Sequence, residues 1–120
     1  MDANAISASL TSFLSSPINS VWLHDDNKIF QVYVRKSRRL IGYSIMHPVF
    51  DVSNVNVARE HQQQGLFKSW LKTAELIAKQ HGFVGVYVES ILNPHLVAFL
   101  LREGYVVVGD LLPPNMYKHL

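Results

Sequence analysis

A short polar loop joins a strand pattern to a helix pattern in the stretch Asn54-Val55-Asn56-Val57-Ala58-Arg59-Glu60-His61-Gln62-Gln63-Gln64-Gly65-Leu66-Phe67. The first N–H groups of a helix have no partner inside it, and the helix dipole adds partial positive charge at the same end. A loop that contains glycine at this point is a common place to bind a phosphate group. An ordinary strand-to-helix connection has the same pattern, so both interpretations stay open.

The segment that follows the loop has the most regular helical pattern in the chain. From Leu66 to His81 the apolar residues recur at three- and four-residue spacing, and charged residues occupy the opposite face. Glu75 and Lys79 are spaced for an ion pair on that face, and Gly82 suits the C-terminal cap. The pattern therefore predicts an amphipathic helix directly after the loop.

The rest of the chain shows both the helical period and the strand period. The predicted helices cover residues 4–15 and 94–103, the second with Asn93 as its N-cap, Pro94 at its first position and Gly104 at its end. The basic run Arg35 to Arg39 is interpreted as a hairpin turn with a solvated surface. The predicted strands cover residues 21–24, 29–34, 40–46, 49–58, 84–89, 105–109 and 116–120, the last as an edge strand and 84–89 as a buried central one.

Composition predicts one folded domain over residues 1–120, with 48% hydrophobic and 17% charged residues. The net charge of +2 is too small to argue for nucleic acid binding, and the chain has no cysteine. Its six histidines lack spacing suited to a metal site, so no metal is expected. With no membrane span or secretory signal in the pattern, we expect a soluble cytoplasmic protein. Trp22, Trp70 and Tyr87 are expected in the core.

Two motifs in register resemble the GNAT superfamily of acyl-CoA-dependent N-acyltransferases. Gln62 and Gly65 match its central loop motif, and Asn93 with Gly104-Tyr105 matches an Asn that opens a helix ending in Gly-Tyr. The resemblance covers roughly residues 28 to 120. It implies an α/β (α+β) fold with a mixed, mostly antiparallel sheet of six to seven strands, splayed central strands and three to four helices.

The resemblance also implies acetyl-CoA as co-substrate. The backbone N–H groups from Gln62 through Gln63, Gln64, Gly65 and Leu66 to Phe67 would hold its pyrophosphate. Backbone groups of Asn56, Val57 and Ala58 would bond the pantetheine arm like an added strand, and the N–H of Val57 would polarise the thioester carbonyl. Asn93 would contact the pantetheine, and a plain helix N-cap is the equal alternative.

The sequence departs from the family pattern at two positions. Leu100 stands where many members have the Tyr that protonates the departing thiolate, and Phe67 stands at the last position of the loop motif. The helical spacing of Phe67 favours a side chain that points into the core. The candidates for a general base are Glu89 and Asp51, with a solvated strand end as the alternative for Glu89.

The function implied by the resemblance is transfer of an acetyl group from acetyl-CoA to a primary amine, which is a small molecule or a protein. The alternative is a GNAT-like protein that has lost catalysis and serves as a structural or interaction protein. Asn93 to Gly104 is also similar to short GNAT-like proteins of bacteriophages, which suggests a virion or assembly component as that alternative. A homodimer or an assembly partner is compatible with either function.

Overall fold

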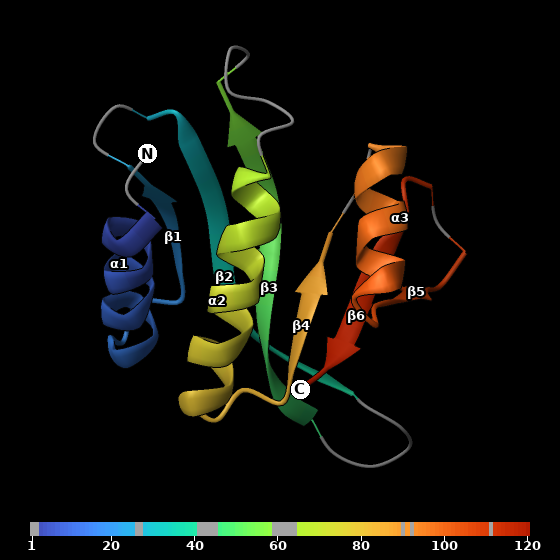
Figure 1. The fold of residues 1–120 in the computed structure, drawn as a ribbon. Helices are drawn as coiled ribbons and strands as arrows, with labels where there is room; N and C mark the ends of the chain where they lie inside the picture. The colour runs from blue at the N-terminus through green and yellow to red at the C-terminus, as the bar shows by residue number, and fades with distance from the viewer. Residues whose placement is uncertain are drawn as a thin grey trace.

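A six-stranded sheet with the strand order β1-β2-β3-β4-β6-β5 forms one layer of the protein, and the helices pack against it (Figure 1). The computed structural model describes residues 3–25, 28–40, 46–58, 65–89, 91, 93–110 and 112–120. Along the chain the elements are α1 (Ala3–Ser15), β1 (Ser20–His24), β2 (Phe30–Leu40), β3 (Met46–Val57), α2 (Leu66–Gln80), β4 (Gly85–Val88), α3 (Pro94–Arg102), β5 (Val106–Val108) and β6 (Asn115–His119).

The sheet is mixed and mostly antiparallel, as the resemblance implied. β1, β2 and β3 pair antiparallel, β3 and β4 pair parallel, and β6 pairs antiparallel with both β4 and β5. The single parallel pair needs a crossover, which α2 provides. The described strands and helices number six and three, within the predicted range.

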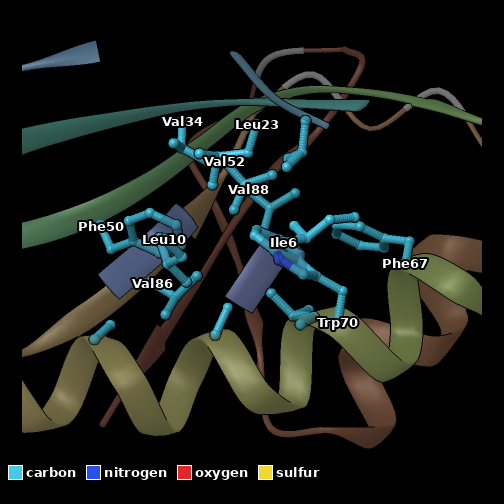
Figure 2. Close-up of a cluster of buried hydrophobic side chains, with 14 of the residues drawn as sticks. Ile6, Leu10, Leu23, Val34, Phe50, Val52, Phe67, Trp70, Val86 and Val88 are labelled. Carbon is cyan, nitrogen blue, oxygen red and sulfur yellow. The ribbon is translucent and has the colours of Figure 1, made fainter. Parts of the chain in front are cut away.

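All three helices lie on one face of the sheet, where alternate strand residues point toward them. In β2 these residues are Phe30, Val32 and Val34, each fully buried. Figure 2 shows Ile6 of α1 beside Trp70, and Leu10 of α1 beside the strand side chains Phe50 and Val86. The predicted inner face of α2 is therefore confirmed, and a fully buried side chain of this size contributes about 1.5–3 kcal/mol.

Polar contacts tie α2 to the last part of the chain. The hydroxyl of Tyr105 donates a 2.7 Å hydrogen bond to Oε2 of Glu75, and the ammonium of Lys118 lies 3.2 Å from Oε1. Burial and the Glu75 carboxylate both raise the pKa of Tyr105. Glu75 therefore bonds to β6 and to the residue that precedes β5, and the predicted pair with Lys79 is wrong.

Three further expectations about the fold are wrong. The basic run Arg35 to Arg39 lies inside β2, which pairs with β3 along its whole length, and is no turn. The terminal strand β6 lies between β4 and β5, so β5 forms the edge. Trp22 is 44% exposed because it lies on the face of the sheet opposite the helices, where its ring packs 5.3 Å from that of Tyr33.

The boundaries of the second half are close to expectation. Gly82 and Gly104 follow α2 and α3 with φ of 85° and 96°, a left-handed conformation that glycine adopts without strain. The predicted strand over residues 40–46 falls mostly on residues 41–45, which lie outside the described residues. None of the described helices is long and apolar enough to cross a membrane.

Candidate functional site

The two central strands, β3 and β4, separate about halfway along β3. Parallel pairing joins Val49–Val52 to Gly85–Val88, and the N–H of Glu89 donates a last 3.0 Å hydrogen bond to the carbonyl of Val52. β3 then continues to Val57, paired only with β2 among the described strands. The edge of β3 that faces β4 is therefore unpaired with β4 in its second half. Figure 1 shows the two strands diverging there.

A β-bulge decides which backbone groups face this gap. The register shifts between Tyr33 and Val34, which pair with Asn54 and Val52, so Ser53 is the extra residue. Beyond it the N–H of Ala58 donates to the carbonyl of Ile29, at 2.7 Å. Since backbone groups alternate sides along a strand, those of Val55 and Val57 point to the β4 side.

This geometry shows how the backbone of the predicted pantetheine residues is directed. The N–H of Ala58 is already bonded to Ile29, and by alternation the backbone groups of Asn56 point to β2 as well. Of the three predicted residues, Val57 alone has backbone groups directed toward the gap. Val55, which the sequence did not single out, shares that direction.

The N-terminus of α2 has no side-chain cap among the described residues. Its N-cap is Gly65, with φ 72° and no side-chain capping bond. The N–H groups of Leu66, Phe67 and Lys68 have no acceptor within the described part of the chain. The predicted loop residues Gln62, Gln63 and Gln64 lie outside the described residues, so the described part of the cradle is Gly65 and the first turn.

Phe67 points into the core, as its spacing predicted. Its side chain is 7% exposed, and its ring centroid lies 6.0 Å from that of Trp70 and 6.5 Å from that of Phe30. The ring therefore leaves the N–H groups of the first turn uncovered. Lys68 is exposed at the same turn, with its ammonium 5.2 Å from the ring of Phe99 on α3, and adds a positive charge beside the helix end.

The side chain of Asn93 caps α3. Its Oδ1 accepts a 2.8 Å hydrogen bond from the N–H of His95, so the N-cap interpretation is confirmed. A contact between Asn93 and a pantetheine stays a prediction. Leu100 is fully buried, and its aliphatic side chain has no proton to donate.

Four charged side chains gather where β3 and β4 part, on the face opposite the helices. Arg35 and Arg39 of β2 both donate from Nη2 to Oε1 of Glu89, at 2.6 and 3.2 Å. Arg39 also donates to both oxygens of Asp51, at 2.9 and 3.4 Å. Arg35 donates from Nε to the hydroxyl of the bulge residue Ser53, at 2.9 Å. We call Arg35, Arg39, Asp51 and Glu89 the charge cluster.

The charge cluster brings together both predicted general-base candidates but places them differently. Asp51 is 1% exposed beneath Arg39, whereas the side chain of Glu89 is 21% exposed at the point of divergence. Burial raises the pKa of Asp51 above its ordinary value of 3.8, and Arg39 offsets this only in part. Glu89 is therefore the carboxylate that an incoming molecule could reach.

Sequence reasoning missed the two arginines of the charge cluster and Lys68. The basic run that contains Arg35 and Arg39 suggests a turn. In a strand, however, their four-residue separation places both side chains on one face. Lys68 belongs to the charged face of α2. Its place in the first helical turn was the available signal.

Comparison with known proteins gives matches in structure alone. No family model matches the sequence. No curated protein matches it either.

Several solved structures share the fold at low sequence identity. The PaiA N-acetyltransferase of Thermoplasma acidophilum, solved with coenzyme A, is 14% identical with a TM-score of 0.63, over 93% of this chain and 68% of that one. Nourseothricin acetyltransferase is 17% identical with a TM-score of 0.55, over 82% and 62%. The AtaT toxin, solved with the C-terminus of the antitoxin AtaR and acetyl-CoA, is 15% identical with a TM-score of 0.56, over 76% and 58%.

The chain thus spans less than two thirds of the length of AtaT and of nourseothricin acetyltransferase. Another structure of AtaT contains acetyl-methionyl-tRNAfMet, so the comparisons do not support the expectation that nucleic acid plays no part. The resemblance to phage proteins finds no support among these structures either. What the likeness shows is the architecture: this chain has the GNAT fold, which it shares with acetyltransferases that bind acetyl-CoA or coenzyme A.

Proposed function

We propose that this protein transfers an acetyl group from acetyl-CoA to a primary amine, by direct attack of the amine within a ternary complex. The observation that carries the proposal is the separation of β3 from β4 near a helix N-terminus that has no side-chain cap among the described residues. The free edge of β3 would pair with an extended arm, and the first helical turn would supply donors for a pyrophosphate.

The residues present fit such a co-substrate. The N–H groups of Leu66, Phe67 and Lys68, which have no acceptor among the described residues, would donate to phosphate oxygens, and the charge of Lys68 would add to the helix dipole. The backbone of Val55 faces the gap and has no β4 partner, so it could pair with an amide of the pantetheine arm. When bound, acetyl-CoA supplies an activated acetyl group on a thioester.

The acceptor amine would approach from the face of the sheet opposite the helices, because α1, α2 and α3 cover the other face. Glu89 directly follows the last paired residue of β4. Its side chain points to this open face, as does that of Tyr87. We assign Glu89 the role of holding the ammonium of the acceptor and accepting its proton. Asp51, buried beneath Arg39, would act on Glu89 through the arginines.

One observation favours a protein without catalysis as the second candidate. Leu100 is fully buried at the position that carries a proton donor in many proteins of this fold, so the departing thiolate lacks a dedicated acid there. A thiolate is a tolerable leaving group, which keeps transfer possible without this acid. A structural or assembly protein, including one from a phage virion, would retain the fold and lack turnover.

A thiol-release assay separates the two candidates. The protein is incubated with acetyl-CoA and a panel of primary amines, and free CoA thiol and acetylated amine are measured together. Amine-dependent release above the rate without protein supports transfer. Binding of acetyl-CoA with no release for any amine, peptide or aminoacyl-tRNA would favour the second candidate.

A further inference from the structure

The charge cluster satisfies only part of its hydrogen-bonding capacity. Glu89 accepts both arginine bonds at Oε1, and its Oε2 has no partner among the described residues. Arg35 bonds through Nε and Nη2, and so does Arg39, which leaves Nη1 of each guanidinium without a partner in the described part of the chain. The cluster therefore offers one carboxylate oxygen and two guanidinium nitrogens to a ligand.

The two guanidinium groups are held in place by contacts on their inner sides. Arg39 lies over the ring of Tyr87, with Cζ 3.6 Å from the centroid, and is fixed below by Asp51. Arg35 is fixed between Ser53 and Glu89. The side chains of Arg35 and Arg39 are 42% and 33% exposed while Asp51 is 1% exposed, so the donors form the outer layer. A ligand that binds there finds the arginines already ordered.

Arginine pairs fixed in this way suit planar or tetrahedral anions. A guanidinium donates parallel hydrogen bonds to a carboxylate or phosphate, and these charge-assisted bonds are stronger than neutral ones. The open oxygen of Glu89 suits an ammonium group instead. The cluster thus offers guanidinium groups to the anion of a zwitterion and a carboxylate to its ammonium. These groups lie close together, because both arginines bond to Oε1 of Glu89.

We propose that the charge cluster is the acceptor site and selects amines that carry a carboxylate or phosphate group, with the anion on Arg35 and Arg39 and the ammonium on Glu89. The inference rests on the proposed acetyl transfer and names its substrate class. An alternative use of the cluster is to brace β2 against β3 and β4 through ion pairs alone. The two uses differ in whether an anion on the acceptor changes catalysis.

Matched acceptor pairs test the proposal: phenylalanine with phenethylamine for the carboxylate, and O-phosphoethanolamine with ethanolamine for the phosphate. The anionic member of at least one pair should have a kcat/KM about tenfold higher, the effect of one charge-assisted hydrogen bond. In Arg35→Gln this ratio should fall toward one, mainly through a higher KM for the anionic amine, and Arg35→Lys should restore part of it. The pair that responds identifies carboxylate or phosphate as the anion.

Arg38→Gln is the matched control, because residue 38 alternates to the other face of β2 from Arg35. Equal kcat/KM within both pairs, or an equal loss of the ratio in the Arg35 and Arg38 variants, would overturn the proposal while leaving acetyl transfer intact. If no amine is acetylated, acetyl-CoA binding reports separately on the proposed function. The acceptor site is then tested by NMR: inorganic phosphate at about 10 mM should shift the Nε–Hε signal of Arg35, and no shift would refute the site.

Discussion

The conformation of Gly65 makes the phosphate cradle testable with one substitution and one internal control. Gly65 precedes α2 with φ 72°, and Gly82 follows the same helix with φ 85°. A Cβ at either position would have no atom of the described residues within 4 Å, its chain neighbours aside. Substitution by valine therefore meets backbone strain at both ends of the helix and steric contact at neither, and the two changes differ only in their distance from the proposed ligand.

The expected strain is about 1–2 kcal/mol for each variant, the cost of a left-handed backbone for a residue with a Cβ. That corresponds to a fall in Tm of roughly 3–8 °C for a domain of this size. Relief of the strain at Gly65 moves the first-turn N–H groups, and a Cβ there would project into the space of the ligand. Loss of one bond to phosphate weakens binding about 10- to 100-fold.

The assay is a calorimetric titration of acetyl-CoA into each folded variant, with Tm measured in parallel. Gly65→Val should lose about 10- to 100-fold in affinity, and Gly82→Val should keep the affinity of the parent protein. Equal affinities for the two variants, at comparable losses of stability, would refute the cradle at the start of α2.

Three further outcomes follow from the structure. Burial raises the pKa of Asp51, so its stabilising contribution is complete below pH 3.8 and is lost as pH rises through its folded pKa. In urea unfolding, the free energy of unfolding of the parent protein relative to Asp51→Asn should therefore fall over that pH window. A rise would contradict the burial argument. Tyr105→Phe should cost about 1–2 kcal/mol in the same assay by removing the bond to Glu75, with no change in acetyl-CoA affinity. Lys68→Ala should weaken acetyl-CoA about two- to fivefold, in a salt-dependent way, whereas Lys79→Ala at the far end of α2 should not, and equal effects would remove Lys68 from the site.

Features were predictable from the sequence where the residue pattern itself determines the local structure. The apolar stripe of α2 follows helical spacing because one face packs on the sheet, and Phe67 and Trp70 are both buried as expected. Gly82 and Gly104 mark helix ends because a left-handed residue is needed there. The N-cap role of Asn93 follows from its side chain in the same way.

Long-range contacts explain what the sequence could not reveal. Arg35 and Arg39 belong to a strand because Asp51 and Glu89, remote along the chain, neutralise them across the sheet. Local composition alone indicates a polar turn. The insertion of β6 between β4 and β5 depends likewise on pairing partners that no local pattern specifies.

The bulge at Ser53 was the least predictable feature and matters most for the candidate site. It shifts the alternation of β3 by one residue, so that Val55 and Val57, in place of Asn54 and Asn56, direct their backbone toward the gap. No glycine or proline marks this position in the sequence. The resemblance pointed to this strand, and the register decides which of its residues direct their backbone toward the gap.

Acetyl-CoA is proposed to bind at one site, formed by the start of α2 and the gap between β3 and β4. Calorimetric titration of the unmodified protein with acetyl-CoA tests it most directly. We expect saturable binding of one molecule per chain, with a Kd well below about 1 mM. An absence of binding heat, together with an unchanged Tm at about 1 mM acetyl-CoA, would contradict it.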